Sequence, residues 1–221
     1  MKSIVLIHTV QSLAVSFSEN LQNFLQEKVK IHNIWDDFLA NNPNEIGEFS
    51  LENKNRLFYI IKAAELTHAD VIVTTCSTLT PTIKEIRPFI KTPIIAIDDA
   101  VTKKAAKEGN HILILATAES ALKATKEKIL EETKLLNTKP YIESIALTDA
   151  FQCLKKMDMK KHDEIIKHYV SSIKGFDCIV LAQASMAHLE KEISNLTNCL
   201  VLSSPTLCMK EIQNFLKTIN K

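Results

Sequence analysis

The chain has 221 residues, of which 46% are hydrophobic and 24% are charged, so it is long and apolar enough to bury a sizeable core. Its 27 basic and 26 acidic side chains leave a net charge of +1, which is too small to attract nucleic acid. No apolar run approaches the roughly 20 residues that are needed to span a bilayer. We therefore expect a globular, cytoplasmic protein with no nucleic-acid partner and no membrane segment.

Short apolar runs alternate with helical patterns along the chain. Eight runs have the composition of β-strands, at residues 4–9, 29–35, 70–75, 94–97, 112–117, 140–147, 177–182 and 199–203. Patterns of helical period lie between several of them, at 11–28, 54–68, 119–136 and 160–174. The apolar runs are nearly continuous, which is typical of parallel strands covered on both faces by helices. The sequence therefore predicts an α/β protein.

The second half of the chain repeats the first. The run 4–9 aligns with 112–117, and at nearly the same shift residues 70–78 align with 177–185, so the order of the strands agrees in the two halves. A repeat of this length indicates two copies of one structural unit. The alternative is one continuous doubly wound sheet whose strands resemble one another.

The repeat predicts two similar α/β lobes. We expect each lobe to hold a parallel four-stranded sheet, the lobes to be related by a pseudo-twofold axis, and the active site to lie in the cleft between them. The first lobe would comprise residues 1–99 and 207–221, with a C-terminal helix near 206–219, and the second would comprise residues 100–206. In such sheets ligands bind at the carboxyl ends of the strands.

Glycine and cysteine usage excludes several kinds of site. None of the three glycines lies in a GxGxxG or GxxxxGK[ST] pattern, so the standard glycine-rich cradles for NAD and for nucleotide phosphates are absent. The five cysteines include no CxxC pair, which argues against a disulfide framework or a structural zinc site. We expect free thiols, no structural zinc or other bound metal, and no classical NAD or P-loop nucleotide site.

One cysteine occupies a reactive position. Cys76 follows the apolar run 70–75 and precedes Ser77 and Thr78, where a helix should begin. The partial positive charge of a helix start favours a thiolate, and its free N–H groups, with the two hydroxyls, suit a carboxylate. The alternative is a small buried thiol with Ser77 or Thr78 as a structural cap.

The position of the second half that aligns with Cys76 holds a different residue. It is Gln183, which donates and accepts hydrogen bonds but does not exchange a proton near neutral pH. The remaining thiols lie in apolar strand runs or helical stretches, and we expect them to have packing roles: Cys153, Cys178, Cys199 and Cys208. Only one half of the repeat thus offers a thiol at a strand end.

Two segments carry a family resemblance. Thr74–Thr78, which reads TTCST, resembles the first cysteine motif of the aspartate/glutamate racemase superfamily, whose members include hydantoin racemases, maleate isomerases and arylmalonate decarboxylases. Val180–Met186 resembles the second motif, with Gln183 in place of its cysteine. Further landmarks extend the resemblance over essentially the whole chain: Ile97–Ala100, Ile112–Thr117, Ala150–Phe151 and His162–Asp163.

The resemblance implies a chemistry. In that family two lobes enclose a substrate between two cysteines, without a cofactor; one thiolate removes a proton from carbon and the other thiol supplies one. Hydrogen-bond donors stabilise the enolate-like intermediate. Cys76 would be the first cysteine, and the implied binders of the substrate are Ser77, Thr78, Thr117, Ser120, Gln183, Ala184 and Ser185.

The missing second cysteine calls for another proton carrier. His8, at the carboxyl end of the first run, is our candidate for this catalytic role, with a structural strand-end histidine as the alternative. Asp98 and Asp99 are further candidates, unless they only cap the following helix. His162 is another candidate, with a helix-surface or capping residue as the alternative.

Together these observations predict a cofactor-independent, single-cysteine, racemase-like enzyme. It would act at the carbon alpha to a carboxylate of a small amino or dicarboxylic acid, and this small acid is the expected partner. The alternatives are a decarboxylase or cis–trans isomerase of the same superfamily, which need only one thiol, and a catalytically silent carboxylate-binding protein. A homo-oligomer is also compatible with the sequence.

Overall fold

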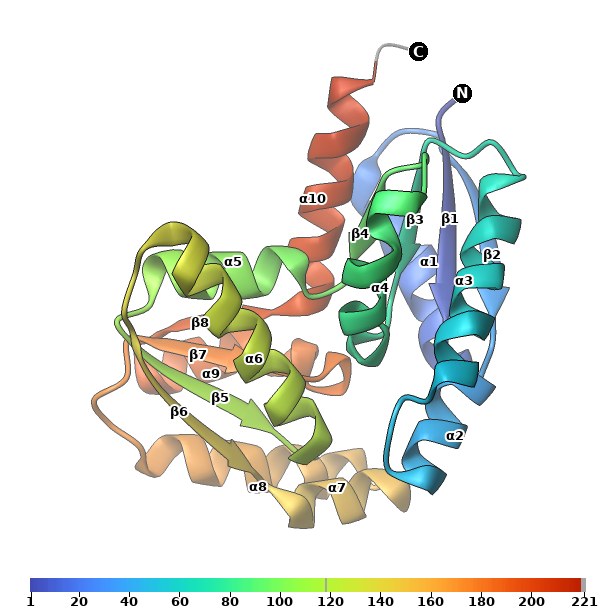
Figure 1. The fold of residues 1–221 in the computed structure, drawn as a ribbon. Helices are drawn as coiled ribbons and strands as arrows, with labels where there is room; N and C mark the ends of the chain where they lie inside the picture. The colour runs from blue at the N-terminus through green and yellow to red at the C-terminus, as the bar shows by residue number, and fades with distance from the viewer. Residues whose placement is uncertain (118, 220–221) are drawn as a thin grey trace. The chain divides into compact units, whose positions relative to one another are not determined.

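The chain forms two compact units in the computed structural model, which describes residues 1–117 and 119–219, apart from the side chains of Ser12 and Ser120 (Figure 1). Unit 1 comprises Met1–Ile97 and Cys208–Lys221, and unit 2 comprises Asp98–Leu207. Over the described residues, no helix is both long enough and apolar enough to cross a membrane.

Unit 1 is built on a parallel sheet of order β2-β1-β3-β4. Its strands are β1 (Ser3–His8), β2 (Lys30–Trp35), β3 (Val71–Thr74) and β4 (Ile94–Ala96). Its helices are α1 (Gln11–Leu25), α2 (Phe38–Ile46), α3 (Leu51–Glu65), α4 (Thr80–Ile86) and most of α10 (Ser204–Thr218), with short 3-10 helices η1 (Ser77–Leu79) and η2 (Arg87–Phe89).

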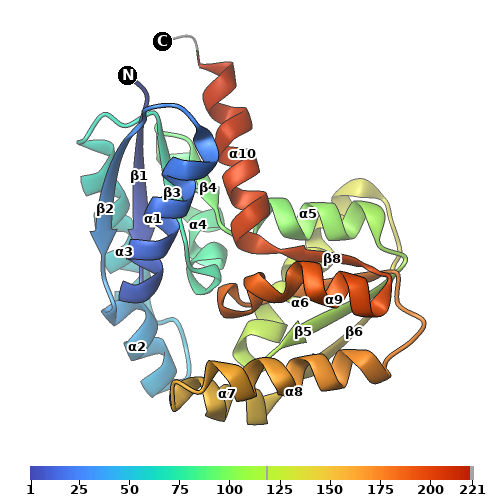
Figure 2. The same cartoon turned by 180° about the vertical axis from the view of Figure 1, so that it is seen from behind.

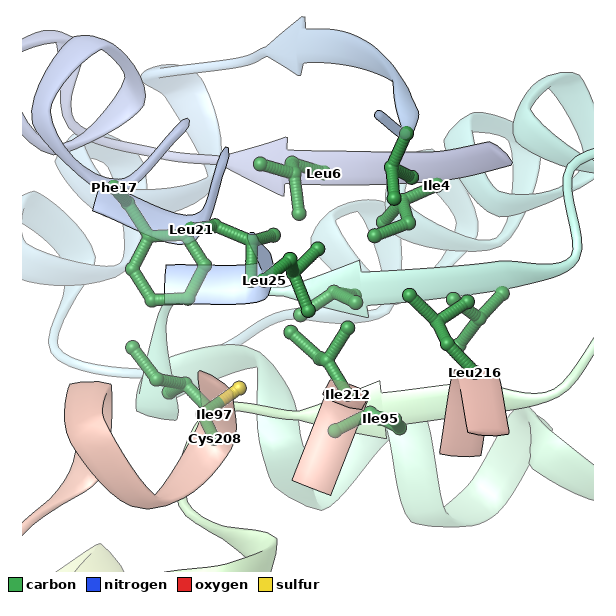
Figure 3. Close-up of a cluster of buried hydrophobic side chains, with 13 residues drawn as sticks. Ile4, Leu6, Phe17, Leu21, Leu25, Ile95, Ile97, Cys208, Ile212 and Leu216 are labelled. Atoms are coloured by element: carbon green, nitrogen blue, oxygen red, sulfur yellow. The ribbon is translucent and has the colours of Figure 1, made fainter. Parts of the chain in front are cut away.

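Alternate residues of each strand of unit 1 face two separate hydrophobic clusters. Ile4 and Leu6 of β1 belong to the cluster under α1 and α10, whereas Val5 and Ile7 belong to the cluster under α2, α3 and α4. Figure 3 shows the first cluster, in which Ile212 of α10 lies between the strands and the end of α1. Both faces of the sheet are therefore covered, as the continuous apolar runs predicted.

Unit 2 repeats this architecture with the order β6-β5-β7-β8, again all parallel. Its strands are β5 (His111–Ala116), β6 (Tyr141–Ala146), β7 (Cys178–Leu181) and β8 (Leu200–Ser203). The helices are α5 (Asp99–Glu108), α6 (Glu119–Leu136), α7 (Thr148–Lys155), α8 (Met159–Ser172) and α9 (Glu190–Thr197), with a 3-10 helix η3 (Ala184–Leu189). Residues of α5 and α6 pack on one face, and residues of α7, α8 and α9 pack on the other (Figure 2).

The prediction of two α/β units, each with a parallel four-stranded sheet, is confirmed. All eight apolar runs contain strands, and the two halves have the same strand order, so the alternative of one continuous sheet is wrong. The predicted helix at 54–68 instead spans Leu51–Glu65 because Ser50 and Asn53 form a capping box that starts it earlier. The shorter helices α2, α4, α5, α7 and α9 have 7 to 10 residues each, too few for a clear helical period.

Gly109 joins α5 to β5 at a point with no room for a side chain. A Cβ atom there would lie 2.5 Å from Ile112 Cγ1 and 3.0 Å from both the Ala105 carbonyl oxygen and Cys178 Cβ. We expect Gly109→Ala to lower the free energy of unfolding by about 1–3 kcal/mol through overpacking, in urea denaturation followed by circular dichroism. Lys107→Ala, at an exposed position of α5, is the matched control.

The backbone of Gly109 is ordinary, with φ of −89° and ψ of 135°. At such a position replacement by alanine normally stabilises a protein, by about 0.4–1 kcal/mol, because it restricts the unfolded chain. The two effects have opposite signs, so a Gly109→Ala variant as stable as the wild type would contradict the steric argument.

Candidate active-site residues at the strand ends

Cys76 lies just beyond the carboxyl end of β3. Its backbone is extended, with φ of −130° and ψ of 121°, and it immediately precedes η1. The side chain is half-buried against the α2–α4 cluster. Ser77 is half-buried and Thr78 exposed. The sequence predicted the start of a helix here; the structure has a 3-10 helix of three residues that continues into α4.

His8 is fully buried at the end of β1, and both its ring nitrogens have hydrogen-bond partners. Nε2 lies 3.0 Å from Asn33 Oδ1, and Nδ1 lies 2.8 Å from the Thr75 hydroxyl. Burial lowers the pKa of His8, although the hydrogen bond with Asn33 acts in the opposite direction. A neutral ring that donates from Nε2 to Asn33 and accepts at Nδ1 from Thr75 satisfies both contacts. The imidazole is thus linked to Cys76 through the residue before it.

Thr9 was not among the predicted site residues. It follows β1 and is buried, and no hydrogen-bond partner for its Oγ1 lies among the residues that the structure describes. The internal repeat contained the signal that identifies it, because Thr9 aligns with Thr117. A buried hydroxyl without a partner requires an explanation, such as a bound polar group.

In unit 2 the structure brings together two predicted residues, Thr117 and Gln183. The Gln183 Oε1 atom accepts hydrogen bonds from the Thr117 backbone N–H, at 2.5 Å, and from the Thr117 hydroxyl, at 3.0 Å. Thr117 is fully buried at the end of β5, and Gln183 precedes η3 with φ of −134° and ψ of 140°. Two convergent donors of Thr117 therefore bind one partly negative oxygen.

The other predicted residues of unit 2 lie close in sequence to Gln183. Ala184 and Ser185 begin η3 and are half-buried. The Ser185 hydroxyl oxygen is buried, with no partner in the part of the chain that the structure describes. The side chain of Ser120 lies outside the described residues.

Cys76 and Gln183 occupy equivalent places in their two sheets. Each is an extended residue between a strand end and a 3-10 helix. The residue before each donates its backbone N–H to the central strand: Thr75 to the Ile7 carbonyl at 3.0 Å, and Ala182 to the Leu115 carbonyl at 2.9 Å. Cys76 therefore has the same position in unit 1 that Gln183 has in unit 2, as the repeat predicted.

Asp98 and Asp99 have a structural partner. Lys128 Nζ lies 2.9 Å from Asp98 Oδ1 and 2.6 Å from Asp99 Oδ1, which ties the start of α5 to α6. Asp98 occupies the N-cap position of α5, but its side chain makes no capping hydrogen bond there. The ion pairs, rather than a cap, account for this acidic pair.

The remaining cysteines are free, and two of them are fully buried. Burial raises the pKa of Cys178 to about 12, which makes this thiol unreactive. The Cys199 thiol donates to the Phe176 carbonyl at 3.0 Å. Among the described residues, no group of three or more His, Cys, Asp or Glu side chains is arranged to hold a metal ion.

The lowered pKa of His8 predicts a pH dependence of stability. Below its ordinary value of 6.5 the unfolded chain binds more protons than the folded one, so stability is complete above pH 6.5 and falls as the pH decreases toward the lowered pKa. One proton contributes a slope of at most about 1.4 kcal/mol per pH unit. We expect His8→Asn to reduce the loss of stability between about pH 7.5 and about pH 5.5.

The single tryptophan makes this measurable in urea. Trp35 pairs with His8 in the register of β1 and β2, so its fluorescence reports unit 1 directly. His68→Asn is the control, because His68 is exposed and its φ of 56° suits asparagine. Equal pH dependence in the wild type and the His8→Asn variant would contradict this prediction.

Comparisons with known proteins agree with the predicted family and fold. The model of the Asp/Glu/hydantoin racemase family matches residues 45–212. A Yersinia pestis protein assigned as an Asp/Glu racemase has a TM-score of 0.77 at 13% identity, over 97% of this chain and 99% of that one. The aspartate racemase of Picrophilus torridus has a TM-score of 0.71 at 18% identity, over 97% and 95%.

The maleate isomerase of Pseudomonas putida, solved with maleate, has a TM-score of 0.60 at 12% identity, over 98% of this chain and 93% of that one. At these identities the similarity establishes the fold, which is that of racemases and isomerases. No curated protein matches the chain. Since the family model covers most of its length, the chain belongs to the Asp/Glu/hydantoin racemase family.

Proposed function

We propose that this protein is a cofactor-independent enzyme that transfers a proton at the carbon next to a carboxylate, in a small amino or dicarboxylic acid. The observation that carries the proposal is the half-buried thiol of Cys76 at the carboxyl end of β3, beside the hydroxyls of Ser77 and Thr78. A thiolate there accepts the α-proton, and the resulting thiol returns one.

Groups that can bind the carboxylate lie at the same edges of the two sheets. The Thr9 and Ser185 hydroxyl oxygens are buried without partners among the described residues, which supports their binding to substrate oxygens. The two donors of Thr117 already hold the oxygen of Gln183, and a carboxylate oxygen is an acceptor of the same kind. We propose Ala184 as a contact and Ser120 as a further binder, the latter from the sequence alone.

We propose that His8 acts through another residue. The sequence predicted it as the second proton carrier. Its ring is buried and hydrogen-bonded to Asn33 and Thr75, which supports a positioning role for the backbone that presents Cys76. In this role His8 does not exchange protons with the substrate.

Gln183 favours two alternatives to racemisation. A decarboxylase or a cis–trans isomerase needs one thiol, to protonate one face of a carbanion or to add to a double bond. A silent binding protein would use the same carboxylate-binding groups without turnover. The structural similarity to a maleate isomerase supports the first alternative, and the glutamine in place of a second thiol supports both.

Solvent deuterium incorporation tests the proposal. In D₂O we expect the purified protein to exchange the α-hydrogen of at least one member of a panel of D- and L-aspartate and D- and L-glutamate. Loss of maleate absorbance without exchange would identify the isomerase. Ligand-dependent thermal stabilisation with no turnover would identify the binding protein and refute the enzyme.

A further inference from the structure

The sheet of unit 1 has two edge strands, and they differ in how open they are to another chain. β4 has three residues, and all of them are buried. β2 has six residues, of which Lys30, Asn33 and Trp35 are exposed, and its register with β1 is continuous, without a bulge or a proline. Natural proteins usually shorten, bulge or charge such an edge, because an open edge recruits further strands. The edge of β2 lacks these protections apart from Lys30 at its first position.

The corresponding strand of unit 2 is protected. β6 is also an edge strand of six residues, but it has Glu143 in its middle. The Glu143 carboxylate is exposed and pairs with His111 of the neighbouring strand at 2.8 Å. A charged side chain at the centre of an edge opposes the addition of another strand. The open edge is therefore a property of β2 and not of the repeated architecture.

The backbone of β2 shows which of its residues point outward. The N–H groups of Lys30 and Asp36 donate to carbonyl oxygens at the two ends of β1, each at 2.9 Å. Because successive residues of a strand point their backbone groups in opposite directions, the N–H and C=O groups of Ile31, Asn33 and Trp35 face away from β1. No strand of the described chain pairs with β2 on that side (Figure 2).

These outward groups define one register for pairing β2 with a second β2. In an antiparallel pair, two outward-pointing residues that lie opposite each other exchange two hydrogen bonds. All three outward residues are paired when a twofold axis passes through Asn33. Ile31 then lies opposite Trp35 of the second copy, and Asn33 lies opposite Asn33. A shift of the register in either direction leaves one of the three opposite a residue outside the strand.

The charges at the two ends of β2 are complementary in this register. Lys30 lies opposite Asp36 of the second copy, and the twofold axis repeats this pair at the other end. Opposite charges that face each other across two strands stabilise the pairing. Asp36 is already held by Arg56 at 2.6 Å, so its carboxylate has a fixed position. A parallel alignment would instead place Lys30 beside Lys30.

A groove beside the edge can receive the exposed tryptophan of a second copy. Trp35 is the only tryptophan of the chain, and it is 50% exposed. Ile31 packs against the cluster under α1, and the two-residue period of a strand places Trp35 on the same face. The groove has a volume of about 480 Å³ and is lined by residues of α1 and of the start of β2: Ser18, Glu19, Gln22, Asn23, Val29 and Ile31. Since Ile31 lies opposite Trp35 of the second copy, that ring meets the groove.

We propose that a second copy of this chain binds along the open edge of β2, antiparallel to it, with the twofold axis through Asn33. The interface uses the same surface of both copies, as twofold symmetry requires. The two four-stranded sheets become one continuous sheet, and each groove holds the Trp35 ring of the other copy. The partner is the same chain because β2 itself supplies the acidic end that matches Lys30 and the aromatic ring that matches Ile31. This inference does not depend on the proposed function.

Sedimentation equilibrium of the purified protein tests for the second copy. We expect a particle of twice the 24.9 kDa mass of the chain. Trp35→Lys removes the ring and adds the kind of charge that protects natural edges, so it should raise the dissociation constant of the dimer at least about 30-fold. Tyr59→Lys is the matched control, because Tyr59 is an exposed aromatic residue of α3, and it should dimerise like the wild type. Circular dichroism checks that both variants fold.

Cross-linking tests the register. In Asn33→Cys the two new thiols face each other across the axis, at roughly the 5.5 Å Cα separation that a disulfide accepts. In Lys30→Cys they are roughly 20 Å apart, since each lies three residues from the axis. Under mild oxidation we expect Asn33→Cys to form a disulfide-linked dimer, and Lys30→Cys to form no more of it than the wild type with its five free thiols.

Three results would overturn the proposal. The first is a wild type that remains monomeric at all concentrations, which would leave the edge to some other partner or to none. The second is a dimer that Trp35→Lys leaves as tight as in the wild type. The third is cross-linking of Lys30→Cys but not of Asn33→Cys. If Trp35→Lys does not fold, the mass of the wild type and the two cysteine variants still decide.

Discussion

Replacing Cys76 with serine is expected to lower the rate of α-deuterium exchange by at least about 100-fold without unfolding unit 1. Serine is nearly the size of cysteine, but its hydroxyl ionises far less readily than a thiol, so it neither removes nor returns a proton near neutral pH. Cys76 is only half-buried, at the edge of its hydrophobic cluster, so the loss of sulfur leaves little packing defect. Exchange is followed by proton NMR in D₂O, with Trp35 fluorescence as the measure of folding.

Cys153→Ser is the matched control for this substitution. Cys153 is also half-buried and free, but it lies within helix α7 and does not follow a strand directly. Its variant should exchange deuterium at the wild-type rate. Equal rates in the wild type and the Cys76→Ser variant would remove the thiol from the mechanism, whereas equal losses in both serine variants would point to a general effect on folding.

The arrangement of the strands was predictable because burial constrains it strongly. A strand such as β3, in the middle of a parallel sheet, must be apolar on both faces, and the run 70–75 shows this directly. The internal repeat then indicated two separate sheets rather than one continuous sheet. Helices such as α4 and α9 were not predicted, because so few residues do not establish a helical period.

Hydrogen bonds at the strand ends were harder to predict. His8 contacts Asn33 and Thr75, which are 25 and 67 residues away in sequence, and spacing alone does not identify such partners. The contact between Thr117 and Gln183 spans 66 residues, although each residue was selected separately from its motif. Motifs thus identified the residue types, while the pairs that they form depended on the register of neighbouring strands.

His162 shows how a helix can mislead a reading of the sequence. It lies next to charged residues at the start of α8, a context typical of a solvent-exposed turn. The helical period nevertheless places it in line with Ile166 and Val170, which are buried in the same cluster. The periodicity of α8 therefore contained the signal, and it outweighs the polarity of the immediate neighbours.

Shortening Ile212 to alanine is expected to lower the free energy of unfolding of unit 1 by about 2–5 kcal/mol. Its side chain is fully buried in the cluster between α10 and the sheet, close to Leu25 and Ile95 (Figure 3). The truncation removes apolar contacts and leaves a cavity that the surrounding strands cannot close. Urea denaturation followed by Trp35 fluorescence measures the change in the unit that contains both residues.

Lys210→Ala provides the control, because Lys210 is exposed on the same helix and should alter stability by less than about 0.5 kcal/mol. A small effect of Ile212→Ala would mean that α10 contributes little to the core of unit 1. A large effect has a consequence for folding: residues near both ends of the chain build one hydrophobic core, so unit 1 completes its packing only after the segment that forms unit 2 has been synthesised.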